Sequence, residues 1–138
     1  MDNEIELKNI RNILNENDNI EFLGIKLNKN ISIRAFGNKN YYIIGNDYED
    51  EIGINIETLE LYTLSNKTFY LNNSFDKFIK CVKYFMENLN LEEDYIEDER
   101  HKQIKEIQKG IQKIDETALS NENNWWSLII EQADDGIL

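Results

Sequence analysis

The chain has one histidine and one cysteine, and neither stands in a pattern typical of catalysis. His101 lies in the polar run 99–102, and no neighbour in the sequence is placed to act with it as an acid or base partner. Cys81 falls in the middle of a predicted helix at the edge of its apolar stripe, away from the positive charge or helix start that activates a thiol. One cysteine and one histidine cannot complete an ordinary zinc site. We therefore predict no catalytic residue, no cofactor, no metal site and no enzymatic activity.

Acidic residues are the more conspicuous chemistry, and they are clustered. The run Asp-Tyr-Glu-Asp-Glu at 47–51 resembles the start of a calcium loop, but Ile52 stands at the sixth position, where an EF-hand requires glycine. A solvated hairpin tip is the better interpretation. A second run, 87–99, carries seven acidic residues and no basic one, and no lysine or arginine follows Lys113.

The formal net charge of −12 restricts the classes of partner. Such a field repels nucleic acid and anionic membranes, and it attracts a basic protein and speeds the encounter. Acidic runs are also commonly no more than solvated faces. If they bind a partner, the expected residues are Asp47, Glu49, Asp50, Glu51, Glu92, Glu93 and Asp94.

Two adjacent tryptophans give a further candidate contact. Trp125 and Trp126 fall in a predicted helix, where neighbouring side chains point about 100° apart, so both cannot face one narrow core stripe. One anchors the helix, and the other is expected at the rim, where tryptophan often contacts a partner. We assign Trp126 to the partner-binding set, with burial of both rings as the alternative.

Composition favours one soluble domain over residues 1–138. The chain is long enough for a usable core, and hydrophobic residues make up 41% of it. The start of the chain lacks the pattern of a secretory signal, and no apolar stretch approaches the ~20 residues that span a bilayer. A single cysteine suits a reducing compartment. We expect a cytoplasmic protein, monomeric or weakly dimeric.

The elements that must position these residues follow from the changing hydrophobic period. Helical spacing predicts an amphipathic helix over 4–16, and alternation with turn residues predicts six strands between 20 and 71. Their connections are too short for crossover helices, so the sheet should be antiparallel. Helices are predicted over 73–89, capped by Asn73, and over 98–114 and 121–135, with Gly136 as a C-cap. The strands are expected at 20–27, 31–36, 41–45, 52–56, 59–64 and 68–71. This is an α+β domain, an antiparallel sheet packed against several helices.

Three segments resemble a known family. Residues 68–78, Thr-Phe-Tyr-Leu-Asn-Asn-Ser-Phe-Asp-Lys-Phe, are similar to the strand-then-helix signature of the SUKH superfamily of immunity proteins, and 52–62 to the hairpin before it. Ile-Asp-Glu-Thr-Ala-Leu at 114–119, followed by the two tryptophans and a terminal Gly-Ile-Leu, resembles the close of the fourth SUKH-type subfamily. The resemblance covers about 50–138. It departs at Glu116, where proline is commoner, and at Asn73, where serine is.

The resemblance implies an α+β protein that binds and neutralises a bacterial toxin, many such toxins being nucleases. Nuclease domains are often basic, which agrees with the acidity of this chain. Two other functions stay open. One is an adaptor or regulatory module of the same fold without a toxin partner, which the neighbouring reading frame would distinguish. The other is a metal-dependent hydrolase, which would require carboxylates that converge in one pocket.

Overall fold

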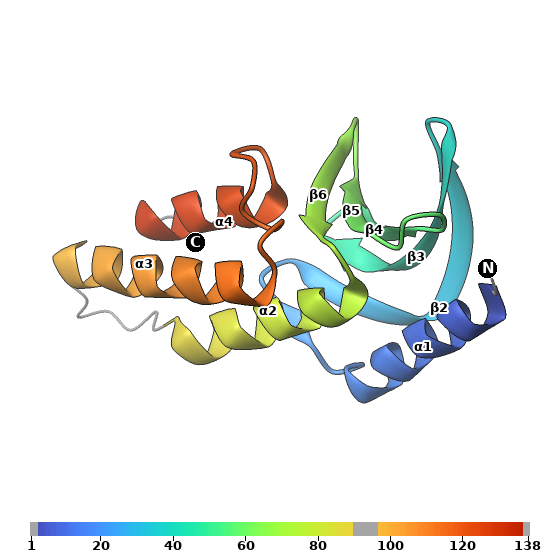
Figure 1. The fold of residues 1–138 in the computed structure, drawn as a ribbon, viewed down its shortest axis with the longest axis horizontal. Coiled ribbons are helices and arrows are strands. Elements are labelled where there is room, and N and C mark those ends of the chain that lie inside the picture. Colours follow the sequence, from blue (N-terminus) through green and yellow to red (C-terminus); the bar gives the residue numbers. More distant parts are fainter. Residues whose placement is uncertain (1–2, 90–96, 137–138) are drawn as a thin grey trace.

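The computed structural model describes residues 3–89 and 97–136, and over these it has the predicted α+β class. Six strands form one antiparallel sheet in which each strand pairs with its neighbours in sequence order, from β1 to β6. The sheet curls strongly, and the helices gather beneath it and to one side (Figure 1). In chain order the elements are α1 (Asn3–Glu16), β1 (Glu21–Phe22), β2 (Ile25–Phe36), β3 (Lys39–Asp47), β4 (Asp50–Asn55), β5 (Leu61–Leu64), β6 (Thr68–Asn72), α2 (Phe75–Asn88), α3 (Glu97–Ile114) and α4 (Trp125–Asp134).

The first two predicted strands are divided differently from the expectation. The strand predicted over 20–27 is broken by a two-residue turn at Leu23 and Gly24. The break predicted at 28–30 is absent, because these residues form a bulge inside β2, where residues 28–31 lie opposite Ile44 alone. Gly45 of β3 permits the bulge, since a Cβ there would lie 2.3 Å from the backbone oxygen of Lys26.

The apolar stripe of α2 covers the sheet as its spacing predicts. Phe78, Val82 and Phe85 are fully buried, and the ring of Phe85 lies 5.2 Å from that of Phe22 in β1. The predicted N-cap is wrong by one residue: Ser74, not Asn73, caps the helix, and its hydroxyl accepts from the amide of Lys77.

Helix α3 lies beside α2, and the glycine inside it has a packing role. A Cβ at Gly110 would lie 2.1 Å from the ring of Tyr84 in α2, so glycine lets that ring lie against α3. This contact explains a residue that costs a helix about 1 kcal/mol relative to alanine. Helix α4 is shorter than predicted, because residues 121–124 form turns that end at the N-cap Asn124. Its C-cap is Asp135, and Gly136, the predicted C-cap, follows in the left-handed conformation with φ +74°.

A buried carboxylate joins the sheet to the helices. Asp115, 1% exposed, follows α3 and accepts four hydrogen bonds: from the side chain of Asn72 (2.9 Å), the amide of Asn73 (2.8 Å), and the hydroxyl (2.6 Å) and amide (3.0 Å) of Thr117. The oxygen of the Asn72 side chain in turn accepts from the indole N–H of Trp126 at 2.8 Å. One carboxylate therefore links β6, the start of α2, the end of α3 and, through Asn72, α4.

Neutralising this carboxylate should destabilise the fold. Burial opposes the ionisation of Asp115, but the donors of Thr117, Asn73 and Asn72 outweigh it and lower its pKa. A lowered folded-state pKa means that the charge stabilises the fold above the pKa of the unfolded chain, and that this stabilisation is lost as pH falls through the folded-state pKa. We expect Asp115→Asn to lower the free energy of unfolding by about 2–4 kcal/mol at pH 7. The NH₂ group of the new asparagine would face hydrogen-bond donors that now bind a carboxylate oxygen.

Urea denaturation of wild type and variant over a pH series will measure this effect, and the difference should narrow toward pH 3. Asp76→Asn is the matched control, since Asp76 is exposed and, within residues 3–89 and 97–136, its side chain has one partner, the ion pair to Lys80 one turn on in α2. It should change stability by less than about 1 kcal/mol. An equal effect of the two substitutions would contradict the role given to Asp115.

Candidate functional site

Two tight turns lie side by side at one end of the sheet. Leu23 and Gly24 join β1 to β2, and Tyr48 and Glu49 join β3 to β4; the pairing of Ile25 with Asp47 brings the two turns together. The amide of Tyr48 donates to the carbonyl of Gly24 at 2.8 Å. The ring of Tyr48 lies on Gly24, because a Cβ there would be 2.3 Å from it. Absence of a side chain at residue 24 therefore leaves room for the tyrosine ring.

Both turns hold a large side chain in a backbone conformation that L-residues disfavour. Leu23 has φ 55° and Tyr48 has φ 54°, in the left-handed region, which costs an ordinary residue about 1–2 kcal/mol. Burial does not offset this cost, since Tyr48 is 77% exposed and Leu23 41%. Glycine or asparagine is the usual solution, and this chain is rich in asparagine. Strained, exposed, apolar side chains are a reason to look for a binding function.

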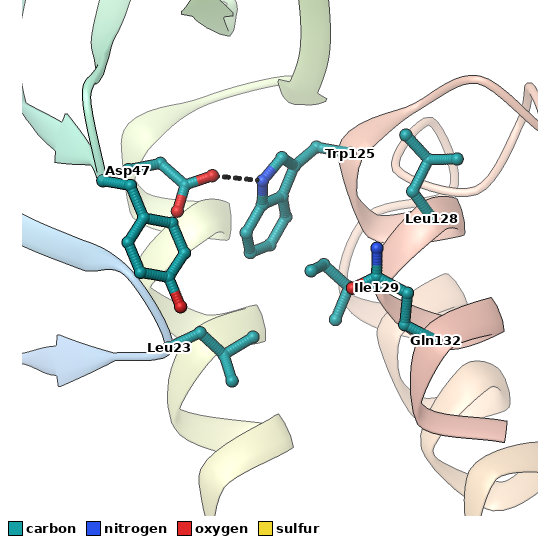
Figure 2. A pocket seen from close by; sticks show the side chains of 7 residues that line it. Leu23, Asp47, Trp125, Leu128, Ile129 and Gln132 are labelled. Carbon is teal, nitrogen blue, oxygen red and sulfur yellow. Dashed lines mark hydrogen bonds between the residues drawn. The ribbon is translucent and has the colours of Figure 1, made fainter. Parts of the chain in front are cut away.

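A pocket of about 320 Å³ opens between these turns and α4. In Figure 2, Leu23 and Asp47 lie on the sheet side, Leu128, Ile129 and Gln132 lie along α4, and the ring of Trp125 extends from α4 toward Asp47. The pocket is lined by Leu23, Asp47, Tyr48, Trp125, Leu128, Ile129 and Gln132. Its walls are mainly apolar, and Asp47 is the one charged residue among the described residues that line it.

Asp47 lines the pocket at the place where the sheet meets Trp125 of α4. Its Oδ2 accepts the indole N–H of Trp125 at 2.8 Å, while its Oδ1 accepts no hydrogen bond within the described part of the chain. Burial raises the pKa of Asp47, the nearby charge of Asp50 adds to this rise, and the Trp125 hydrogen bond opposes it. The carboxylate is therefore half-buried and incompletely compensated.

The structure brings together some of the predicted binding residues and separates others. Asp47 lines the pocket, and Glu49 and Asp50 line a shallow hollow beside it together with Tyr48. Glu51 is ion-paired with Arg34 of β2, so the charge of Glu51 is neutralised within the sheet. Glu92, Glu93 and Asp94 lie outside the described residues.

The assignment of Trp126 to the partner-binding set is wrong. Its side chain is fully buried, and its ring packs among those of Phe22, Phe78 and Phe85. Trp125 is the tryptophan that reaches the pocket, although it too is largely buried, with its ring edge-on to Trp126.

Sequence reasoning missed most of the pocket, namely Leu23, Tyr48, Trp125, Leu128, Ile129 and Gln132. One signal was available: Tyr48 is an aromatic residue at the centre of an acidic hairpin tip, where packing in a core is not expected. Nothing local in the sequence distinguishes Leu23 or Leu128 from core residues.

The surroundings of His101 and Cys81 are those of residues that support the fold. His101 is partly exposed and pairs through Nδ1 with the carboxylate of Asp134, which fastens α3 to α4. Cys81 is fully buried, and burial raises the pKa of its thiol to about 12, so it stays a thiol at neutral pH. Over residues 3–89 and 97–136, no three histidine, cysteine or acidic side chains are grouped as a metal site. None of the described helices has both the length and the apolar character to cross a bilayer.

Comparison with known proteins adds a family to this geometry. The family model described as SUKH-4 immunity protein matches residues 34–132, which include Asp47, Tyr48, the Asp115 hydrogen bonds and both tryptophans. The chain belongs to the SUKH-4 immunity protein family. The resemblance noted in the sequence is thereby confirmed. Searches of curated proteins and of solved structures found no match. Membership supports an immunity-protein role for the chain, and such a role implies a toxin as partner.

If Tyr48 is kept for recognition and not for the fold, its removal should not destabilise the protein. We expect Tyr48→Asn to raise the free energy of unfolding by up to about 1 kcal/mol, because asparagine tolerates positive φ and little buried area is lost. Chemical denaturation will measure the change. A loss of more than about 1 kcal/mol would mean that the tyrosine ring holds the two turns together.

Proposed function

We propose that this protein neutralises a cognate toxin by binding it at the Tyr48 surface. We define this surface as Tyr48, Glu49 and Asp50 with the pocket formed by Leu23, Asp47, Trp125, Leu128, Ile129 and Gln132. One observation carries the proposal: two strained turns present an exposed tyrosine and leucine beside an apolar pocket, in a member of an immunity family.

The physical properties of this surface suit tight binding. Tyrosine is enriched among the residues that dominate interface energies, and it loses little conformational entropy when it is already held in place. Here the backbone of Tyr48 is fixed by its hydrogen bond to Gly24, and the ring lies over that glycine before any partner arrives. A standard interface buries about 800 Å² on each partner, so the two turns and one face of α4 could form its centre.

The negative charge of the protein indicates that the toxin carries positive charge. With a net charge of −12, and with Glu49 exposed and Asp50 partly exposed beside Tyr48, the protein favours a basic partner, such as a domain that binds nucleic acid. We place the encounter in the cytoplasm, where a toxin of that kind would meet its target. An adaptor of the same fold would use the same surface without a toxin, and the first experiment separates the two functions.

The first experiment tests neutralisation directly. The polypeptide encoded by the adjacent reading frame is expressed in a host cell with and without this protein, and growth is followed. We expect that polypeptide to arrest growth, the wild-type protein to restore it, and Tyr48→Ala to restore it poorly because the central anchor is lost.

Ile33→Ala is the matched control, because Ile33 is 66% exposed on β2 and pairs with Tyr42, five residues or about 17 Å along β3 from Asp47. It should protect as well as wild type. A harmless neighbour, or a toxic one that the wild-type protein does not restrain, would contradict the immunity function. Equal protection by both variants would move the interface elsewhere.

The second experiment tests the electrostatic part of the proposal. Association of the purified pair is measured by stopped flow over a salt series. Steering predicts an association rate that falls steeply as salt rises, while dissociation changes little. Glu49→Lys with Asp50→Lys should slow association about 10-fold or more at low salt, and the rates should converge near 1 M salt, where charges are screened beyond about 3 Å. Glu51 is left intact because it pairs with Arg34.

Glu57→Lys with Glu87→Lys provides a control with the same change in net charge. Glu57 and Glu87 are exposed, and neither lines the Tyr48 surface. This control should slow association much less than the test pair. Equal slowing by the two pairs would mean that overall charge, and not the Tyr48 surface, steers the encounter. A flat salt dependence would assign the acidity to solubility alone.

A further inference from the structure

The pocket beside Tyr48 has the chemistry of a site for one long cationic side chain. Leu23, Leu128 and Ile129 supply apolar walls, and Asp47 supplies one carboxylate at the inner side of the two turns (Figure 2). Lysine and arginine carry an aliphatic stem with a charge at its end, so they match apolar walls that lead to an acid. The volume of about 320 Å³ is at the lower end of the ~300–1,000 Å³ of ligand pockets, which suits a side chain better than a cofactor.

The state of Asp47 favours a cation over other occupants. Its Oδ2 is taken by Trp125, while its Oδ1 has no hydrogen-bond donor within the described residues. An anionic group would be repelled there, and a purely apolar side chain would desolvate the carboxylate further without pairing it. A metal ion would find one carboxylate and the amide oxygen of Gln132, which is too few ligands for calcium or zinc.

None of the described lysine or arginine residues of the protein itself lines this pocket. Lys26 lines the neighbouring hollow with Leu23, Gly24, Asn46 and Tyr48, but it does not line this pocket. A second copy of the chain is a poor occupant as well, because two molecules of charge −12 repel each other.

We propose that the pocket between the two turns and α4 receives a single lysine or arginine side chain of the toxin, whose cation pairs with Asp47 while Leu23, Leu128 and Ile129 cover its stem. This assignment rests on the proposed toxin-binding function, and it adds the residue type that the toxin presents. The paired carboxylate would be shielded from water by both proteins, so the contact would slow dissociation, whereas the exposed acids around Tyr48 act on association.

The pocket can be tested without the toxin, by using small probes. N-acetyl-lysine methylamide and N-acetyl-arginine methylamide are titrated into ¹⁵N-labelled protein, with N-acetyl-norleucine methylamide as the uncharged match. The indole N–H of Trp125 reports the site because it donates to Asp47, and that of Trp126, buried and bonded to Asn72, is an internal control. We expect the cationic probes to shift the Trp125 indole signal several-fold more than the norleucine probe, and the Trp126 signal to stay in place.

Asp47→Asn is the decisive variant, because its side-chain oxygen can still accept from Trp125 while its charge is gone. Since burial raises the pKa of Asp47, removal of the charge relieves a desolvation cost, and the variant should melt at or above the wild-type temperature. The preference for cationic probes should disappear in it. Equal shifts from the norleucine probe, or a preference that persists in Asp47→Asn, would overturn the proposal.

The same variant separates this proposal from the proposed function. We expect Asp47→Asn to weaken binding of the adjacent polypeptide about 10- to 100-fold, mainly through faster dissociation. If wild type protects and Asp47→Asn binds equally tightly, the pocket assignment fails and the immunity function stands. If wild type neither binds nor protects, the proposed function fails, and the probe titration alone judges the pocket.

Discussion

The buried carboxylate of Asp115 is the constraint on which the arrangement of helices depends. It accepts from Asn72 at the end of β6 and from Asn73 before α2, and so fixes the end of α3 against both. Asn72 also positions α4, because its side-chain oxygen accepts the indole N–H of Trp126. With Trp126 held in the core, Trp125 lies within reach of Asp47, and α4 forms one wall of the pocket. Three hydrogen bonds, from Asp115 to Asn72, from Asn72 to Trp126 and from Trp125 to Asp47, thus connect the interior to the Tyr48 surface, because the two tryptophans are adjacent in the chain.

Asp115 and Asp47 show how the surroundings of a carboxylate decide its use. Asp115 is more deeply buried, yet four donors satisfy it and its pKa is lowered, so its charge stabilises the fold. Asp47 has a single donor among the described residues and a raised pKa, so its charge is a cost to the isolated protein. The positive φ of Leu23 and Tyr48 is a cost of the same kind. Leu59 is the third non-glycine residue with positive φ in the described chain and lies away from this surface, but the other two adjoin the half-buried carboxylate. Costs that adjoin in this way are typical of a site kept for binding.

Local patterns in the sequence predicted the elements better than the site. The stripe of α2 and the short turns were sufficient for an antiparallel sheet covered by a helix, because period and connection length are local. The Asn-rich bulge at 28–30 was misread as a turn, since the glycine that accommodates it is in another strand. Nor could spacing say which tryptophan is buried. Asn72 and Asp115 are 43 residues apart and Asp47 and Trp125 are 78, so only the fold brings each pair together.

If the Tyr48 surface binds a toxin as proposed, its exposed and half-buried acids act at different ranges, and that difference would give both fast association and selectivity. Exposed acids such as Glu49 act over about a Debye length and draw any basic protein closer, so they cannot select among basic partners. Asp47 acts only on a cation that has entered the apolar pocket and left water behind. A basic protein without a side chain at that place would leave Asp47 desolvated and unpaired, which is a penalty against the wrong partner. In the proposed complex, selectivity would therefore come from the half-buried Asp47, and fast association from the exposed acids.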